Sequence, residues 1–216
     1  NETSKFVMVE KYLEQHYEFR YNEVSNEIEC RRKDEKQFTA LNENNIFREL
    51  QHQNIGFSIN YLMTLLRSDF VPVHNPIAHY FEELPEWDGV TDYISELCKF
   101  ITAKDQERFN RHFKKMMVRS VACGLEVAFN KQVFILMGGQ SSGKTTFCRW
   151  LCPVTLKAYY AENISTDKDS LISLTENYII NLDELATMQR IEISALKSML
   201  TKDAVKIRRP YDKKPT

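Results

Sequence analysis

The sequence lacks the features that mark secreted, membrane-spanning or fibrous proteins. Its 216 residues include only six glycines and six prolines, and its five cysteines form no Cys-x-x-Cys pair. No apolar run approaches the roughly 18 residues that a membrane-spanning helix requires, and the N-terminus shows no signal-peptide pattern. We therefore expect a soluble, cytoplasmic protein with reduced thiols and no membrane partner.

Net charge is nearly absent as well. Twenty-nine Lys and Arg residues oppose 30 Asp and Glu residues, so the total charge predicts no nucleic-acid partner, and any basic surface must be local. What the sequence does contain is 43% hydrophobic residues. That content is sufficient for one large buried core or two small ones.

Apolar periodicity and turn residues divide the first part of the chain into short elements. Residues 1–70 predict a helix, a hairpin over 19–28, and two further helices with Asn42 and Ser58 as N-caps. This order predicts a mainly helical, winged-helix-like module. Both DNA binding and a purely structural or oligomerising role remain open for it.

Two further regions follow. Residues 71–118 are expected to form a helical connector, and 119–216 the N-terminal part of a P-loop ATPase domain. A long helix is predicted from about 105 to 129. Its polar face is expected to contact solvent rather than nucleic acid, and it carries Arg108, Arg111, Lys114 and Lys115.

A phosphate-binding loop is the strongest motif of the chain. The apolar run 133–137 predicts a buried strand and leads directly into Gly-x-x-x-x-Gly-Lys-Thr, with a helix beginning near Gly143. Backbone N–H groups and the helix N-terminus favour phosphate there, Lys144 is placed to reach the β- and γ-phosphates, and Thr145 to bind Mg²⁺. The predicted nucleotide contacts are Gly138, Gly139, Gln140, Ser141, Ser142, Gly143, Lys144, Thr145 and Thr146.

A pair of carboxylates supplies the second half of the predicted site. The apolar run 178–182 predicts another buried strand and ends in Asp183-Glu184, 39 residues after Lys144. Ligands bind at the carboxyl edge of parallel sheets, so Asp183 is expected to hold Mg²⁺ and Glu184 to activate the attacking water. Tyr159-Tyr160 is expected to begin a neighbouring strand.

A local excess of positive charge lies near the C-terminus. Polar and apolar residues alternate over 204–208, as in a strand. From chemistry alone, this segment is compatible with a solvated face or with a nucleic-acid contact. Its candidate DNA-binding residues are Lys202, Lys206, Arg208 and Arg209.

Taken together, these motifs resemble the virulence-associated protein E family, phage and mobile-element ATPases related to superfamily three helicases of the AAA+ type. The segments that carry the resemblance are Asn75-Pro76, Leu84 to Gly89, Gly138 to Thr146, Asp183-Glu184-Leu185, and Leu196-Lys197 through Tyr211. It implies a ring, typically a hexamer, whose basic hairpin grips single-stranded or forked DNA in a central channel. It also implies a sensor asparagine and an arginine finger, neither identifiable before Thr216. Because the chain also begins at Asn1 rather than Met, we expect a fragment.

The sequence thus predicts an α/β P-loop NTPase with an AAA+-like parallel sheet, incomplete at its C-terminus, that binds ATP and Mg²⁺. The resemblance implies a DNA-dependent helicase-type motor in the replication of phage or mobile-element DNA. Two alternatives stay open: a nucleotide-dependent assembly switch or initiator without motor activity, and a small-molecule P-loop kinase. Glu184 disfavours the kinase, because kinase sites exclude water whereas a carboxylate beside the metal aspartate suits water activation.

Overall fold

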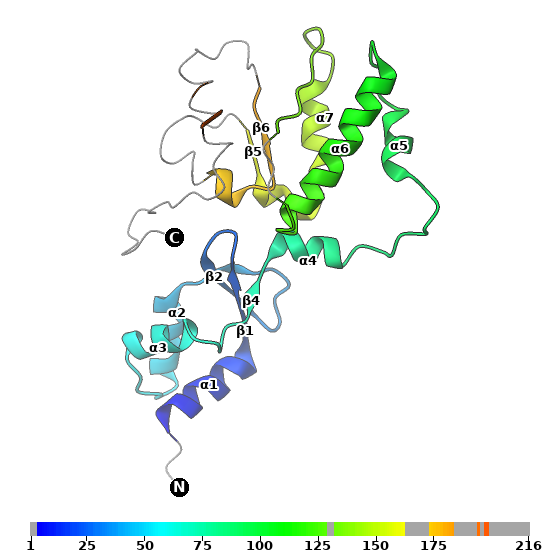
Figure 1. The fold of residues 1–216 in the computed structure, drawn as a ribbon. Coiled ribbons are helices and arrows are strands. Elements are labelled where there is room, and N and C mark those ends of the chain that lie inside the picture. The colour runs from blue at the N-terminus through cyan, green and yellow to red at the C-terminus, as the bar shows by residue number, and fades with distance from the viewer. Residues whose placement is uncertain (1–3, 129–131, 163–172, 184–193, 195–196, 199–216) are drawn as a thin grey trace. The chain divides into compact units, whose positions relative to one another are not determined.

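The chain forms two compact units, Asn1–Pro76 (unit 1) and Ile77–Thr216 (unit 2). Figure 1 shows the elements of this computed structural model. Among the residues it describes, no helix is both long and apolar enough to cross a membrane. The domain boundaries predicted after residues 70 and 118 stay predictions. The described residues are 4–128, 132–162, 173–183, 194 and 197–198.

Unit 1 combines three helices with a four-stranded sheet of order β3-β2-β1-β4. Strands β1 and β2 form the predicted antiparallel hairpin, while β4 pairs in parallel with β1. The two short outer strands were not predicted. The elements are α1 Lys5–His16, β1 Tyr17–Asn22, β2 Glu27–Arg32, β3 Thr39–Ala40, α2 Glu43–His52, α3 Ile59–Leu66 and β4 Val73–His74.

The predicted caps and apolar faces explain the helices of this unit. The Asn42 side chain accepts a hydrogen bond from the Asn45 N–H and begins α2, and Ser58 does the same from the Tyr61 N–H for α3. Both N-cap predictions are confirmed. The inward faces meet the hairpin in one core of Val9, Leu13, Phe19, Cys30, Ile46, Leu50, Phe57, Leu62, Leu65, Leu66 and Val71.

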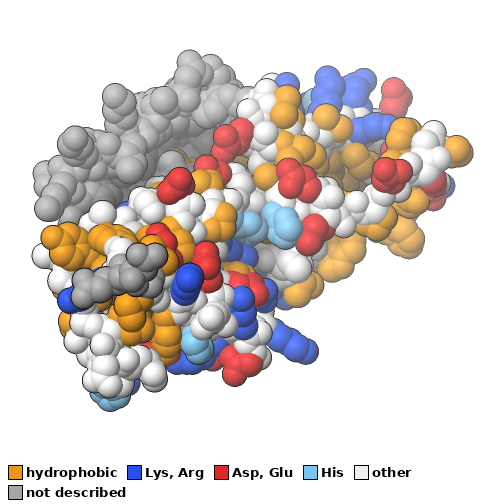
Figure 2. Space-filling model, turned by 90° about the horizontal axis from the view of Figure 1, so that it is seen from below, with side chains coloured by type: hydrophobic (Ala, Val, Ile, Leu, Met, Phe, Trp, Pro, Cys, Tyr) orange, Lys and Arg blue, Asp and Glu red, His pale blue; other side chains and the backbone are white. Residues whose placement is uncertain are grey.

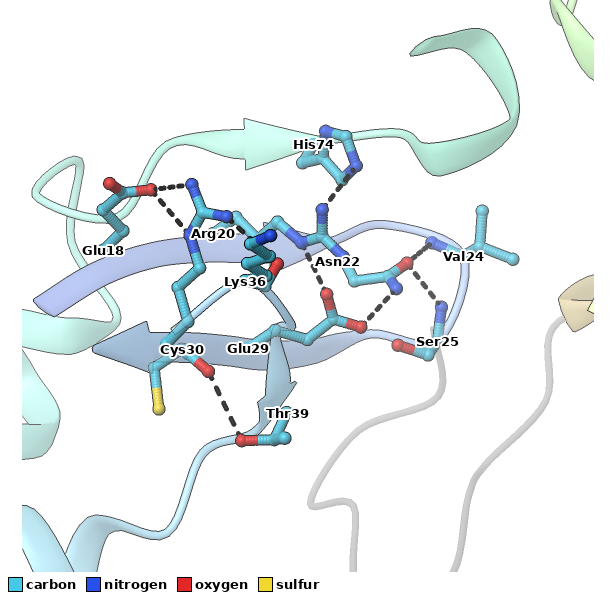
Figure 3. A network of polar contacts seen from close by, with 11 residues as sticks. Glu18, Arg20, Asn22, Val24, Ser25, Glu29, Cys30, Lys36, Thr39 and His74 are labelled. Carbon is cyan, nitrogen blue, oxygen red and sulfur yellow. Dashed lines mark hydrogen bonds and ion pairs between the residues drawn. The ribbon is translucent and has the colours of Figure 1, made fainter. Parts of the chain in front are cut away.

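A polar network closes the hairpin and attaches β4 to it (Figure 3). Glu29 accepts hydrogen bonds from Arg20 Nε at 2.6 Å and from the Asn22 amide at 2.8 Å. Asn22 is buried, and its Oδ1 accepts two backbone N–H groups of the turn. Arg20 also lies 3.2 Å from the His74 ring on β4. The buried Asn22 side chain is thereby paired at both its amide nitrogen and its oxygen, which is the condition for burying it.

A second network joins α1, β1, β2 and α2. The Glu49 carboxylate accepts hydrogen bonds from the Tyr12 and Tyr17 hydroxyls, each at 2.7 Å, and pairs with Arg32. Partial burial opposes ionisation of Glu49, but these three donors outweigh it and lower its pKa. Burial, followed by the bond to Glu49, raises the pKa of Tyr12 to about 12 and that of Tyr17 further.

Unit 2 holds a small parallel sheet with helices beside it. Strand β5 pairs with β6, with Tyr160 opposite Ile179, which confirms the two predicted strands and their parallel direction. The residues of β6 are only partly buried, however, and not buried as predicted. The elements are α4 Pro76–Glu82, α5 Tyr93–Cys98, α6 Gln106–Gly124, α7 Lys144–Leu151, a 3₁₀ helix Val154–Tyr159, β5 Tyr160–Glu162 and β6 Ile179–Asn181.

The long helix α6 ends earlier than predicted. The helix begins where it was predicted, with Asp105 as its N-cap, but it stops at Gly124 and does not continue toward 129. Glu126 adopts a left-handed φ of 57°, and the Val127 N–H bonds back to the Ala122 carbonyl at 2.8 Å. This backbone reversal satisfies the last carbonyls of the helix and turns the chain away.

The run 133–137, predicted to be a buried strand, is not a strand in the structure. Its side chains are largely exposed: Val133 is 47% exposed, Ile135 60% and Met137 91%. A strand needs a hydrogen-bonded neighbour, and β5 and β6 pair with each other. Within the described ranges no strand pairs with 133–137, so the prediction is wrong there despite the suitable composition.

Candidate nucleotide-binding site

The loop 138–143 leads into α7 through a left-handed glycine. Gly143 has φ 80° and ψ 9°, a conformation that side-chain-bearing residues rarely adopt, and it stands at the N-cap of the helix. The Phe147 N–H then bonds to the Gly143 carbonyl at 2.9 Å. The predicted helix start is confirmed to within one residue, and the helix N-terminus faces the loop that the motif assigns to phosphate.

The Lys144 ammonium lies within this loop. Its Nζ donates to the Gly139 carbonyl at 2.7 Å, to the Ser142 hydroxyl at 3.1 Å and to the Gly138 carbonyl at 3.2 Å. An ammonium has three donors, so the loop's own oxygens accept all of them. The same inward orientation suits an anion enclosed by the loop, because phosphate oxygens could take the place of these neutral acceptors.

Thr145 and Asp183 meet directly. The Thr145 hydroxyl donates to the Asp183 carboxylate at 2.8 Å, although the two residues are 38 positions apart. Asp183 follows β6 and Thr145 stands in the first turn of α7, so the fold brings the end of the parallel strand to the phosphate-loop helix. The structure thus brings together two of the predicted site residues. Glu184, which is predicted to activate the attacking water, lies outside the described residues.

These two oxygen ligands fit a magnesium ion. Mg²⁺ prefers hard oxygen ligands and is commonly held by one or two protein groups together with waters and substrate phosphates. Within the described part of the chain, no group of three or more His, Cys, Asp or Glu side chains could hold a metal ion by itself. A shared site, completed by a nucleotide, is therefore the arrangement that the donor set supports.

An ion pair that sequence reasoning missed borders the site. Arg149 lies one helical turn after Thr145 on α7 and forms two bonds to the Glu162 carboxylate, at 2.6 and 2.8 Å. The Tyr160 hydroxyl donates to the same carboxylate at 2.8 Å. These donors, Arg149 first, lower the pKa of Glu162 to about 2. The pair connects α7 to the carboxyl end of β5, and the i, i+4 spacing from Thr145 was its only signal in the sequence.

Aromatic packing holds both flanks of the loop against α6. Phe113 is completely buried, with its ring 6.0 Å from Phe134 before the loop and 5.9 Å from Phe147 after it, measured between centroids. Figure 1 shows α6 and α7 side by side. One core side chain of α6 thus contacts the segments that precede and follow the phosphate-loop motif.

The end of α6 also packs closely. A Cβ added at Gly124 would lie 2.9 Å from Ile77 and 3.2 to 3.3 Å from the rings of Tyr178 and Phe81. Tyr178 stands directly before β6, which leads to Asp183. The absence of a side chain at Gly124 therefore permits the contact between α6 and the start of the strand that carries the carboxylate.

Comparison with known protein families assigns the chain to a family. The sequence model of the virulence-associated protein E-like domain matches residues 81–216, which is well over half of the 216 residues. The chain belongs to the virulence-associated protein E-like family. Among curated proteins, none matches it.

The virulence-associated protein E-like domain begins within α4 and includes the Leu84 to Gly89 connector. There Asp88 accepts hydrogen bonds from the Val90 and Thr91 N–H groups, which, with the Thr91 hydroxyl foremost, lower its pKa to about 2. Gly89 supplies a φ of 74°. The connector therefore contains a turn that the Asp88 side chain closes through these hydrogen bonds. Asn75-Pro76, also part of the predicted resemblance, lies before the matched residues.

The matched range also covers the predicted DNA-binding residues Lys202, Lys206, Arg208 and Arg209, which lie outside the described residues. A cavity of about 650 Å³ lies elsewhere, along α2 in unit 1. Its central carboxylate, Glu49, is already bound by two hydroxyls and Arg32. The phosphate loop, not this cavity, holds side chains arranged for chemistry, so we place the candidate site there.

Proposed function

We propose that this virulence-associated protein E-like chain binds ATP with Mg²⁺ and hydrolyses it. The observation that carries the proposal is the 2.8 Å bond between the Thr145 hydroxyl and Asp183. In P-loop NTPases, the hydroxyl after the loop lysine and an aspartate at a strand end hold the metal that bridges the nucleotide phosphates. A glycine loop that matched by chance would not require its threonine to meet a strand-end carboxylate.

Each residue then has a defined task. Lys144 neutralises the β- and γ-phosphates, and the backbone of 138–143 with the N-terminus of α7 binds their oxygens. Thr145 and Asp183 hold Mg²⁺, which neutralises charge on the phosphates. Glu184 orients the attacking water and accepts its proton.

The proposal extends to a DNA-dependent motor of helicase type that acts in phage or mobile-element replication. Its support is the family membership together with the alternating, basic sequence around Lys206 and Arg208. In this proposal a homo-oligomeric ring, such as a hexamer, places these residues against single-stranded or forked DNA, where cations contact the backbone phosphates.

Two other functions share the phosphate loop and are separated from the motor by one assay. An assembly switch or initiator binds ATP with little turnover, and a small-molecule kinase transfers phosphate to a substrate and not to water. Phosphate release should therefore be measured with and without single-stranded or forked DNA. Stimulation of phosphate release by DNA supports the motor, and nucleotide-dependent assembly without turnover supports the switch. The absence of both results supports the kinase.

The substitution Lys144→Ala tests the site itself. Loss of an ammonium that contacts phosphate should weaken ATP binding about 100-fold, which is about 2.7 kcal/mol. The unfolding temperature should not change, because Lys144 contacts only its own loop. Binding is measured by calorimetry, with the exposed Lys157→Ala as a matched control. Unchanged affinity in folded Lys144→Ala rules out the phosphate-loop assignment.

The companion substitution Glu184→Gln separates binding from hydrolysis. It should leave the affinity for Mg²⁺-ATP within about twofold and slow turnover by roughly 10² to 10⁴-fold, the usual contribution of a positioned general base. Normal turnover in this variant would assign the base to another residue.

A further inference from the structure

One face of α6 carries a row of basic side chains. Arg108, Arg111, His112, Lys115 and Arg119 are all exposed. At 3.6 residues per turn, their spacing confines them to an arc of about 100° of the helix circumference. These five residues are called the basic stripe. In a chain of net charge −1, the stripe is a local concentration of positive charge.

The stripe has no ion-pair partner among the described residues, unlike Lys114 and Lys99 of unit 2. Lys114, on the same helix but outside the arc, pairs with Asp92, and Lys99 pairs with Glu96. The sequence grouped Lys114 with the arginines as one solvated face, whereas the structure separates it from them. In Figure 2, basic and acidic side chains mix over most of the face shown, and several Lys and Arg side chains gather at the upper right.

The opposite face of α6 is already occupied. Phe113 is fully buried against Phe134 and Phe147. The helix therefore cannot insert an apolar face into a lipid surface, as amphipathic membrane-binding helices do. Protein interfaces are enriched in arginine but also in Tyr, Trp, Phe and Met. The basic stripe has three arginines and none of those apolar residues, so it lacks the apolar core of a protein interface.

The dimensions of the stripe suit a regular array of anions. From Arg108 to Arg119 it extends about 16 Å along the helix axis, at 1.5 Å per residue. Duplex DNA carries about one phosphate per 1.7 Å of its axis over both strands, so a row of this length lies beside several phosphates. Single-strand sites add aromatic side chains on which bases stack. The stripe has none apart from the imidazole of His112, which favours a duplex backbone.

We propose that the basic stripe binds the phosphate backbone of double-stranded DNA without sequence preference. The residues of the stripe belong neither to the phosphate loop nor to the predicted DNA-binding residues Lys202, Lys206, Arg208 and Arg209. The contact needs no nucleotide, so it does not depend on the proposed ATPase activity. It would hold the duplex while another part of the protein acts on the strands.

The test is a four-site variant of the full chain in which Arg108, Arg111, Lys115 and Arg119 become Gln. Duplex DNA binding is measured without nucleotide at several salt concentrations. We expect a 10- to 100-fold loss of affinity, and a slope of log K against log salt that is shallower by about 2 to 4. The matched control removes four exposed lysines elsewhere, namely Lys5, Lys11, Lys36 and Lys157.

The control separates a local contact from a change in overall charge. Near-parental duplex affinity in the control supports the stripe, while an equal loss in both variants overturns it. The proposal is also overturned when the stripe variant keeps parental duplex binding, or loses binding only to single strands. Should the four-site variant fail to fold, Arg111→Gln and Lys115→Gln alone should each reduce the slope by about 1, and an unchanged slope in both contradicts the proposal.

Discussion

The two units differ in where they place their apolar and charged groups. Unit 1 surrounds one core of eleven buried apolar side chains, and its central carboxylates, Glu29 and Glu49, are each bound by two or more donors. In the described part of unit 2, only Ile77, Cys98, Phe113, Cys152 and Leu156 are comparably buried. The candidate nucleotide-binding site lies in unit 2, where the Thr145 and Asp183 side chains are close to solvent. Among the described residues, apolar burial is therefore concentrated in unit 1 and the candidate site in unit 2.

The largest effect expected from this difference follows Leu50→Ala. Leu50 is fully buried in the core of unit 1, so its truncation should cost about 2 to 5 kcal/mol of unfolding free energy. The chain's two tryptophans, Trp87 and Trp150, both lie in unit 2. Circular dichroism should thus show an earlier transition in denaturant, while the tryptophan fluorescence transition and ATP affinity stay unchanged. The control is Leu84→Ala, an exposed leucine. If the fluorescence transition shifts equally, the units unfold as one.

An intermediate effect on the free energy of unfolding is expected in alkaline solution. The pKa of Tyr12 is raised from 10.0 to about 12, and that of Tyr17 is also raised. The folded state therefore favours the neutral phenols, and their stabilising contribution is complete below pH 10 and lost as pH rises toward 12. After allowance for partial exposure, we expect a loss of about 1 kcal/mol for Tyr12. Denaturation monitored by circular dichroism at successive pH values measures it.

The substitution Glu49→Gln assigns that pH dependence. It removes the carboxylate that both tyrosines bind, so the alkaline loss should become smaller although Tyr160 and Tyr178 in unit 2 still titrate. The lowered pKa of Glu49 predicts the opposite sign in acid, with its contribution present above pH 4.5 and lost as pH falls through its folded value. An identical alkaline profile in the variant would locate the effect outside this network.

The smallest effect is expected from Arg149→Ala in unit 2. Exposed ion pairs contribute little to stability, so the unfolding temperature should hardly change. Because Arg149 and Glu162 fix α7 against β5 one turn from Thr145, the Mg²⁺ concentration for half-maximal ATP binding should rise about threefold. ATP affinity measured in chelator should not change. Lys114→Ala removes another exposed pair as the control, and an equal Mg²⁺ requirement in both variants leaves Arg149 a purely structural role.

Features of the fold that depend on nearby residues were predictable. The caps at Asn42 and Ser58 and the helix start after Gly143 each depend on a few neighbouring positions. The strand predicted at 133–137 fails because strand formation needs a partner supplied by distant sequence. The early end of α6 depends on a left-handed Glu126, a conformation that residue type alone does not indicate.

The candidate site also combines features that were predictable from the sequence with features that were not. The motifs predicted that Thr145 and Asp183 serve one metal, and the structure shows them in contact. The Arg149–Glu162 pair could not be predicted, because it depends on which residue of α7 faces the end of β5. The helical spacing placed Arg108, Arg111, Lys114 and Lys115 on one solvated face, without His112 or Arg119. Only the structure shows that Lys114 is paired outside the basic stripe.

Gly124 has a consequence for how sequences of this kind can diverge. Its missing side chain leaves room for Ile77, Phe81 and Tyr178, which come from two stretches far apart in the chain. A larger residue at position 124 is compatible with the same packing only where one of these neighbours has become smaller. Positions 77, 81, 124 and 178 should therefore vary together among relatives that contain them, as a correlated set rather than as four independent sites.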